Sequence, residues 1–334
     1  MGLATHALTC RCRRQGPNSL CHFIDRTDAW TPATGAISNC GYSAAGALTA
    51  GALSIATTPP PDSSTVFLAS QNAANATVTV AVPLAGGGTL HTETIVARAE
   101  NVLIVALWTT GTTKAIEANA SIAKLPNGGC FWSDQEVVNN SVVTWRQIGS
   151  AYQDQAHSTV GLRHSVKYAI SVASPDGAVC ADANGNAAIC LPAVAPGKRV
   201  TVVVAVVHNF DLGFEDPIRP AANLTNTLAA RGVSGTAALA ELRDDHGRWW
   251  ARFWSTTSHI EIPESPAAEK MWYGSLYILA SGNREEPTRL AAGRYARDGR
   301  LPPPMGLVWP KTSDKPAFSG SYTMNYVRAP PPPP

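Results

Sequence analysis

Arg199-Val-Thr-Val-Val-Val-Ala-Val-Val-His208 is the most apolar stretch of the chain, and its composition decides the fold class. Valine is branched at Cβ and favours extended backbone, so the stretch is predicted to be a β-strand. Val202 to Val207 are apolar at successive positions, and therefore on both faces of a strand, which is typical of the centre of a sheet. The run is far shorter than the roughly 20 residues of a membrane-spanning helix, so no membrane span is predicted.

Short apolar runs of the same kind occupy the region before this stretch. They are rich in Val, Ile, Thr and aromatic residues, and clusters such as Gly86-Gly87-Gly88 separate them, which is the pattern of strands joined by turns. Predicted strands span residues 66–69, 77–82, 93–97, 102–108, 142–147, 166–172 and 200–207. Because no helical pattern lies between them, we expect a β-sandwich over residues 23–220, after an N-terminal extension of uncertain structure at 1–22.

The periodicity of the sequence changes after Pro217 and Pro220. Apolar side chains then recur every three or four positions, as on one face of a helix, at Leu239, Leu242, His246, Trp249, Trp250 and Phe253. We predict one helix over residues 235–254 and another over 266–280, which begins with a favourable proline. The predicted class is therefore mainly β with α at the C-terminal end. The first of these helices falls in a region of residues 221–260 and the second in a region of residues 261–329, and a proline tail spans 330–334.

The composition excludes several classes of partner. The 334 residues include 26 basic and 24 acidic ones, a formal net charge of +2, so no nucleic-acid binding is expected. No histidine stands at a metal-ligand spacing from a cysteine or carboxylate, so neither a metal nor a cofactor is predicted. Asp182-Ala-Asn-Gly-Asn186 resembles part of a calcium loop, but residue 193 is alanine where such a loop needs glutamate. We interpret this segment as a turn.

The cysteines and the glycosylation sequons bear on the compartment. Cys180 and Cys190 flank the turn signal Asn184-Gly185, so they are expected to face each other across a hairpin, as a disulfide or as two buried thiols. Asn-X-Ser/Thr sequons begin at Asn75, Asn119, Asn139 and Asn223. No secretory signal is visible in the first 20 residues. The sequence leaves the localisation unassigned and slightly favours a secreted or lysosome-like compartment.

Three motifs in the C-terminal third occur in an order that resembles a known enzyme family. They are Arg248-Trp-Trp-Ala-Arg-Phe-Trp254, Met271-Trp-Tyr-Gly-Ser-Leu-Tyr277, and Pro304-Met-Gly-Leu-Val-Trp309 with Pro316-Ala-Phe-Ser-Gly-Ser-Tyr-Thr-Met-Asn-Tyr326. This order resembles that of the glycoside hydrolases of family 95, the alpha-L-fucosidase-like members of the six-hairpin glycosidase group. The specific likeness covers residues 246–325, and Phe23-Ile-Asp-Arg-Thr-Asp-Ala-Trp30 also resembles an early strand segment of these proteins.

The resemblance implies an N-terminal β-supersandwich, a linker helix and the truncated start of an (α/α)6 barrel. It also implies inverting hydrolysis of a terminal glycosidic bond in a carbohydrate or glycan, where one carboxyl group protonates the leaving oxygen and another activates water. Asn325 matches the asparagine that positions this water, whereas Val327 and Ser321 stand where the family has a second asparagine and an acidic residue. The family's two carboxylates arrive on later barrel helices, so we expect this chain to be inactive.

Aromatic residues are the candidates for contact with a sugar. Trp309 follows a loop rich in Pro and Gly, so it is predicted either to stack on a sugar ring or to pack. Tyr322 lies three residues before Asn325 and either hydrogen-bonds sugar hydroxyls or anchors its loop. The helical spacing of four other tryptophans predicts packing between domains instead, at Trp249, Trp250, Trp254 and Trp272.

The remaining polar candidates are assigned structural roles. Glu285 and Glu286 are adjacent and cannot face each other across a sugar, and residues 244–245 are acidic and predicted to be exposed. His208 is expected to be buried at a strand end, and His246 to lie in an interface. The alternative function is a non-catalytic carbohydrate-binding or structural β-sandwich whose helical tail docks on the sandwich.

Overall fold

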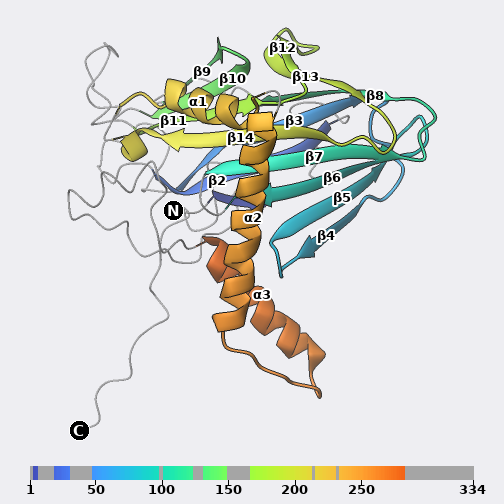
Figure 1. The fold of residues 1–334 in the computed structure, drawn as a ribbon, viewed down its shortest axis with the longest axis vertical. Helices are drawn as coiled ribbons and strands as arrows, with labels where there is room; N and C mark the ends of the chain where they lie inside the picture. Colours follow the sequence, from blue (N-terminus) through green and yellow to red (C-terminus); the bar gives the residue numbers. More distant parts are fainter. Residues whose placement is uncertain are drawn as a thin grey trace.

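The computed structural model describes residues 3–6, 19–30, 47–97, 101–122, 131–148, 166–212, 215–230 and 233–282. Within these ranges the chain forms two antiparallel sheets packed face to face, followed by three helices (Figure 1). The expectation of a mainly β class with helices at the C-terminal end is confirmed. None of the described helices is long and apolar enough to cross a membrane. The predicted proline tail at 330–334 lies outside the described residues.

The larger sheet has eight strands and contains all seven strands that the sequence predicted by residue range. In spatial order they are β4 (Leu68–Asn72), β5 (Thr77–Pro83), β6 (Thr89–Val96), β7 (Val102–Thr110), β14 (Val200–His208), β11 (Val166–Ala173), β10 (Ser141–Ile148) and β9 (Phe131–Val138). The valine-rich strand β14 is central, as expected. Val200 pairs with Leu107 of β7, and His208 pairs with Tyr168 of β11.

The smaller sheet has six strands, most of which the sequence did not predict. In spatial order they are β1 (Leu3–His6), β2 (Ser19–Trp30), β3 (Ala47–Thr58), β8 (Ile116–Ile122), β13 (Ala187–Val194) and β12 (Ala178–Ala181). β2 contains residues 23–30, which resemble an early strand of the fucosidase-like sandwiches, and it begins inside the predicted N-terminal extension. β3 and β8 are rich in Ala, Gly, Ser and Asn, which carry little strand signal.

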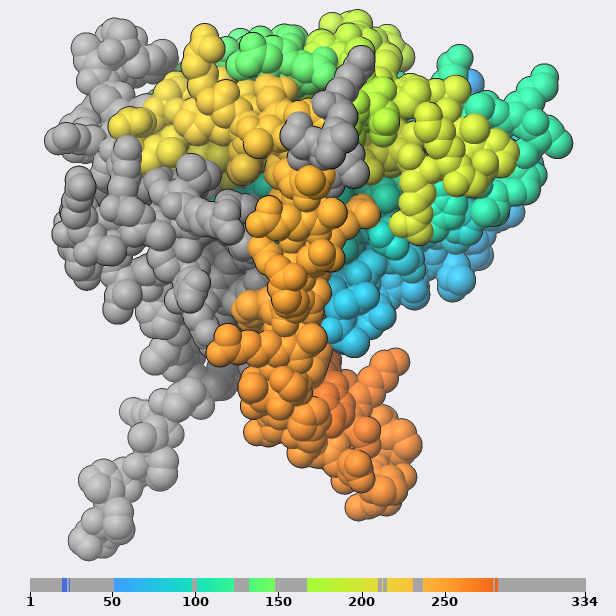
Figure 2. All heavy atoms as spheres, in the orientation of Figure 1, coloured from blue at the N-terminus to red at the C-terminus, as the bar shows by residue number. Residues whose placement is uncertain are grey.

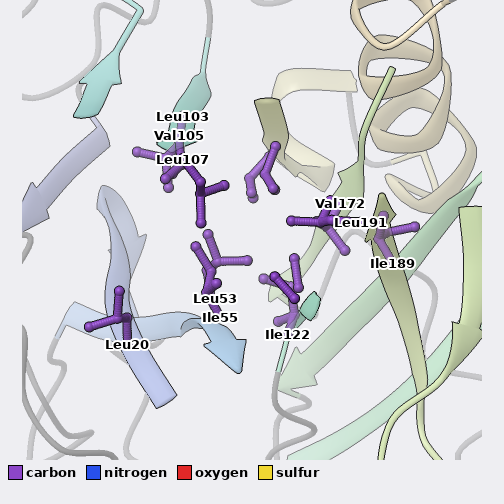
Figure 3. Packing of buried hydrophobic residues seen from close by; sticks show 14 of the residues in the cluster. Leu20, Leu53, Ile55, Leu103, Val105, Leu107, Ile122, Val172, Ile189 and Leu191 are labelled. Atoms are coloured by element: carbon purple, nitrogen blue, oxygen red, sulfur yellow. The ribbon is translucent and has the colours of Figure 1, made fainter. Parts of the chain in front are cut away.

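The two sheets enclose the main hydrophobic core. Leu53 and Ile55 of β3 face Leu103 and Leu107 of β7 across this core, and all four side chains are fully buried (Figure 3). Alternate residues of β14 point into it, namely Val202, Val204 and Val206. The residues between them, Val203, Ala205 and Val207, belong to separate clusters on the opposite face. Burial on both faces is the physical reason for the uninterrupted apolar run of β14.

Helices cover that opposite face of the larger sheet. α1 (Ile218–Leu228) packs Ala221 and Ala222 against Val207, and the Ser171 and Thr225 hydroxyl oxygens lie 2.6 Å apart in the contact. The sequence did not predict α1, since the predicted helices spanned 235–254 and 266–280 only. Pro220 stands in the first turn, where backbone N–H groups have no partner within the helix and proline is tolerated. A short 3-10 helix, η2 (Asn209–Leu212), joins β14 to this region.

The predicted hairpin between Cys180 and Cys190 is present and carries a disulfide. Its turn is longer than the expected two-residue type I′ turn. The Asp182 N–H donates to the Asn186 carbonyl at 2.7 Å, which leaves three residues between them, and Gly185 adopts the positive φ. The Asp182 carboxylate accepts hydrogen bonds from the backbone N–H groups of Asn184 and Asn186. This segment is therefore a turn, as the sequence predicted.

Removing the disulfide is expected to destabilise the protein. The bond links residues ten positions apart and restricts the unfolded chain, so the double substitution Cys180→Ser with Cys190→Ser should cost about 2–3 kcal/mol. Urea denaturation of both proteins measures the difference. The matched control is reductant, which should lower the stability of the native protein more than that of the double variant, in which the disulfide of Cys21 remains. Equal sensitivity of the two proteins to reductant would contradict this assignment of stability to the bond.

Candidate functional site

The candidate site is a helical hairpin that starts on the sheet and projects beyond it. α2 (Val233–Thr256) lies across the outer face of the larger sheet, where Leu242 joins a cluster with Ile104 and Val203. α2 then continues past the sheet, and α3 (Pro266–Gly282) turns back alongside it (Figure 1). Both helices match their predicted ranges closely. In Figure 2 the hairpin forms a column that protrudes from the body of the sheets.

Aromatic rings fill the space between the two helices. Trp250 is 3% exposed and lies at the centre, with the Tyr277 ring of α3 stacked 5.2 Å away between centroids. Trp249 stacks on Phe253 at 5.4 Å, and Trp254 meets Tyr273 edge to face at 6.1 Å. Such pairs combine burial of a large apolar area with favourable ring geometry. These three tryptophans therefore pack on neighbouring rings of α2 and α3, whereas the predicted packing between domains stays a prediction.

Two hydrogen bonds fix α2 to the turn between β4 and β5. The indole Nε1 of Trp254 donates to the Ala73 carbonyl at 2.9 Å, and Nε2 of His246 lies 2.9 Å from the Asn75 carbonyl oxygen. A carbonyl oxygen only accepts, so Nε2 of His246 carries a proton in this contact. His246 is buried in the interface between the helix and the sheet, as the sequence predicted.

The connection between the helices is held by side chains of α3. The Tyr273 hydroxyl donates to the Ile260 carbonyl at 2.9 Å and accepts the Ile260 N–H at 3.2 Å. The Glu269 carboxylate, in the first turn of α3, accepts the Ile262 N–H at 3.1 Å. These bonds stabilise the tight connection between the helices, so α2 and α3 are held as one unit rather than as two independent helices.

The outer side of α3 exposes a set of apolar side chains. Met271, Trp272 and Ile278 are 72%, 39% and 52% exposed, although α3 is otherwise packed on α2. Trp272 Nε1 donates to the Ser258 carbonyl at 3.4 Å, so this tryptophan is only partly packed, in contrast to the other three. Met271 and Ile278 are seven positions apart and therefore lie on one side of α3, where exposed apolar side chains can serve for binding or assembly.

The acidic residues of the hairpin do not form a catalytic pair. Asp244 is exposed, and Asp245 forms an ion pair with Arg248 of its own helix. Glu261 and Glu264 are exposed in the connection, and Glu269 caps backbone as described. Glycoside hydrolysis needs two carboxyl groups that face each other across the scissile bond. The hairpin can therefore bind and position, but its described residues do not supply acid and base.

Two polar networks on the larger sheet hold the fold together. Lys167 forms an ion pair with Asp216 at 2.7 Å and lies over the Trp145 ring at 4.6 Å, and Asp216 also accepts the Ile218 N–H at the start of α1. This network fixes α1 to the sheet. In the second network, Arg146 donates to the Tyr168 hydroxyl at 3.3 Å within the inter-sheet space.

His208 belongs to the second network and is fully buried, as predicted. Its ring stacks on Tyr168 with centroids 6.4 Å apart.

Trp108 is unavailable to a sugar ring, although it lies on the outer sheet face. It is placed between His91 of β6, which stacks on it at 5.3 Å, and Arg199 before β14, at 4.3 Å. Because its strand lies between theirs, neighbours cover both faces of the indole.

The predicted catalytic and sugar-binding residues lie outside the described part of the chain. These are Asn325, Trp309 and Tyr322, and the same holds for Ser321, Val327 and the acidic pair at 285–286. Their roles stay predictions. In the described ranges, no group of three or more His, Cys, Asp or Glu side chains is placed to hold a metal ion.

Sequence reasoning missed the surface to which the hairpin is fixed. The acceptors at Ala73 and Asn75 are backbone carbonyls, and every residue type provides the same group. The only available signal was the turn-forming Asn72-Ala-Ala-Asn75 segment before the strand β5. Comparison with known proteins adds no assignment to this geometry, since no protein-family model and no curated protein matches the chain.

Proposed function

We propose that the chain is part of a glycoside hydrolase of the alpha-L-fucosidase-like six-hairpin group, which hydrolyses a terminal glycosidic bond with inversion. The observation that carries the proposal is the order and attachment of the elements. Two packed sheets are followed by a tryptophan-rich helix fixed to the outer sheet face, and then by an antiparallel aromatic helix. This order agrees with the motif order of that group, with a β-supersandwich, a linker helix and the start of an (α/α)6 barrel.

The proposed role of the described residues is to position a barrel relative to the sandwich. α2 is the linker helix, and its bonds to the β4–β5 turn fix the direction in which the hairpin leaves the sheet. The exposed side of α3, with Met271 and Ile278, is the surface on which further barrel helices would pack. Asn325 would position the attacking water, while Trp309 and Tyr322 contact the sugar. The two carboxyl groups are not among the described hairpin residues.

A second candidate is carbohydrate binding without hydrolysis. The observation that favours it is the combination of a half-exposed indole, Trp272, with the lack of a carboxylate pair on the described hairpin. Aromatic faces bind sugar rings by apolar contact and need no acid or base. In this case the exposed side of α3 with Trp272 is the binding surface itself.

Paired binding and hydrolysis assays on the full 334-residue chain test both candidates. Aryl α-L-fucosides report hydrolysis, and a panel of immobilised glycans reports binding. Hydrolysis that is lost in Asn325→Ala and kept in the matched control Asn140→Ala would support the hydrolase and overturn the expectation that this chain is inactive. Saturable binding without hydrolysis, weakened in Trp272→Ala, would support the second candidate. The absence of both activities would contradict the second candidate. It is the result expected of the first candidate, because this chain is expected to lack the two catalytic carboxyl groups.

A further inference from the structure

Four sequons are present, and the structure places them in different surroundings. Asn119 lies within β8, between β3 and β13, and is half-buried. Asn223 is exposed on α1, and Asn75 is exposed at the turn that contacts α2. Asn139 is exposed at the tip of the β9–β10 hairpin, beside the equally exposed Asn140. Its backbone has a φ of 55°, which asparagine tolerates better than most residues.

The hydroxyl group of each sequon decides when the sequon can be used, because the motif requires the Ser or Thr as well as the Asn. In the folded protein Ser141 is fully buried. Its hydroxyl donates to the Val138 carbonyl at 2.9 Å and accepts from the Asn226 side chain at 3.3 Å. Asn226 belongs to α1 and is 85 residues further along the chain. The final packing around Ser141 therefore waits for α1 to be synthesised and to dock.

The sequon at Asn223 lies on α1 itself, so it is enclosed sooner after its own synthesis. The Thr225 hydroxyl bonds to the carbonyls of Ala221 and Ala222, three and four residues away, and it is fully buried against Ser171. Contacts within a helical turn form as soon as the helix does, on a timescale of about a microsecond or less. Of these two exposed sequons, the one at Asn139 therefore stays open for the longer interval after its synthesis.

The disulfide supplies independent information on the compartment. Cys190 is exposed and Cys180 half-buried, so the bond between them is accessible to reductants. Accessible structural disulfides persist in oxidising compartments such as the endoplasmic reticulum and the extracellular space. N-linked glycans are added in that same export route. The two features agree on a chain that is exported.

We propose that Asn139 accepts an N-linked glycan during synthesis, before α1 docks on the β9–β10 hairpin. The donor is an oligosaccharide joined through a diphosphate to a polyisoprenoid lipid in the membrane. The Asn139 amide nitrogen forms a bond to the anomeric carbon of the first sugar, and the bond from that carbon to the diphosphate oxygen breaks. The amide nitrogen loses one proton, and the lipid diphosphate leaves with the electron pair.

This modification is independent of the proposed hydrolase activity. β9 and β10 lie at the opposite end of the molecule from α3, so a glycan on their hairpin leaves the aromatic surface uncovered (Figure 1). Loss of the glycan in Asn139→Gln is therefore expected to leave the binding of sugars unchanged. Failure of the hydrolase assay and failure of glycan addition are separate results.

The experiment directs the full chain into the export route of a eukaryotic cell with a host signal peptide. Secreted protein is treated with the glycosidase that converts glycosylated Asn to Asp, and peptides are sequenced by mass spectrometry. We expect conversion at Asn139. The shift in gel mobility caused by the glycan on Asn139 should vanish in Asn139→Gln. It should persist in the matched control Asn140→Gln, which keeps the sequon. An unmodified Asn139 in secreted chain with an intact Cys180–Cys190 disulfide overturns the proposal, whether or not the variants fold.

The timing is tested with microsomes. Chain translated in their presence is expected to gain the glycan. Unglycosylated protein that is folded and then mixed with detergent-solubilised microsomes, whose transferase is no longer enclosed in the lumen, is expected to gain none. Equal modification in the two cases would overturn the role of Ser141 burial. Unfolding the second sample with its disulfide reduced should restore modification, which separates lost access from lost enzyme activity.

Discussion

Replacing Trp250 with alanine is expected to remove about 3–5 kcal/mol from the free energy of unfolding, which is typical of deleting a large buried aromatic side chain. Trp250 is 3% exposed and contacts rings from both helices, including Trp249, Phe253 and Tyr277. The cavity would lie between α2 and α3, where neighbouring rings already occupy their preferred geometries and cannot close the gap. Urea denaturation followed by circular dichroism measures the loss.

The matched control is Trp272→Ala on the same hairpin. Trp272 is 39% exposed and makes one hydrogen bond to backbone, so its removal is expected to cost about 1 kcal/mol or less. Limited proteolysis distinguishes local from global loss, because a hairpin that detaches in Trp250→Ala becomes a substrate while the sheets resist. Similar losses in the two variants would contradict a central role for Trp250.

Acidification is expected to destabilise the protein through His22. This β2 side chain is 1% exposed, its two ring nitrogens have no hydrogen-bond partner, and burial lowers its pKa from 6.5 to about 4. The unfolded chain therefore binds a proton more readily than the folded one. The contribution to stability is fully present above pH 6.5 and is lost as the pH falls to about 4. It amounts to about 3 kcal/mol, since one pKa unit corresponds to about 1.4 kcal/mol.

His22→Leu isolates this contribution from that of other titrating groups. Leucine fills a similar space without a titratable nitrogen, so the variant is expected to lose less stability than the native protein between pH 7 and pH 4. His259→Leu serves as the control for the replacement itself, because His259 is exposed in the connection between α2 and α3. Parallel pH profiles for the native protein and His22→Leu would rule out His22 as the source.

Except for β9, the larger sheet was predictable because its strands carry their own signal. β14 and β11 are rich in β-branched residues, and β14 is apolar on both faces because a core lies on each side. The smaller sheet was not. β8 reads Ile-Glu-Ala-Asn-Ala-Ser-Ile, and β3 is built of small residues that fit the sheet only because strands on both sides pair with it. Tertiary pairing decides such segments, and local sequence does not contain that information.

The candidate site was likewise predictable from the sequence only in part. The spacing of apolar residues and the position of Pro266 were sufficient to predict α2 and α3, and the interface role of His246 followed from its place in the pattern. The attachment of α2 to carbonyl groups far away in sequence depends on the folded sheet alone. Predictions for Trp309, Tyr322 and Asn325 rest on a resemblance, and they await the assays described above.

The central place of β14 has a consequence for the order of folding. β7 ends at Thr110 and β11 ends at Ala173, but the strand that joins them begins only at Val200. Until β14 leaves the ribosome, the larger sheet exists as two separate parts, each with an unpaired edge and apolar side chains on it. Unpaired apolar edges are the features that chaperones bind and through which nascent chains aggregate. Slow translation between Thr110 and Val200 would therefore lower the yield of native protein more than the same delay after His208.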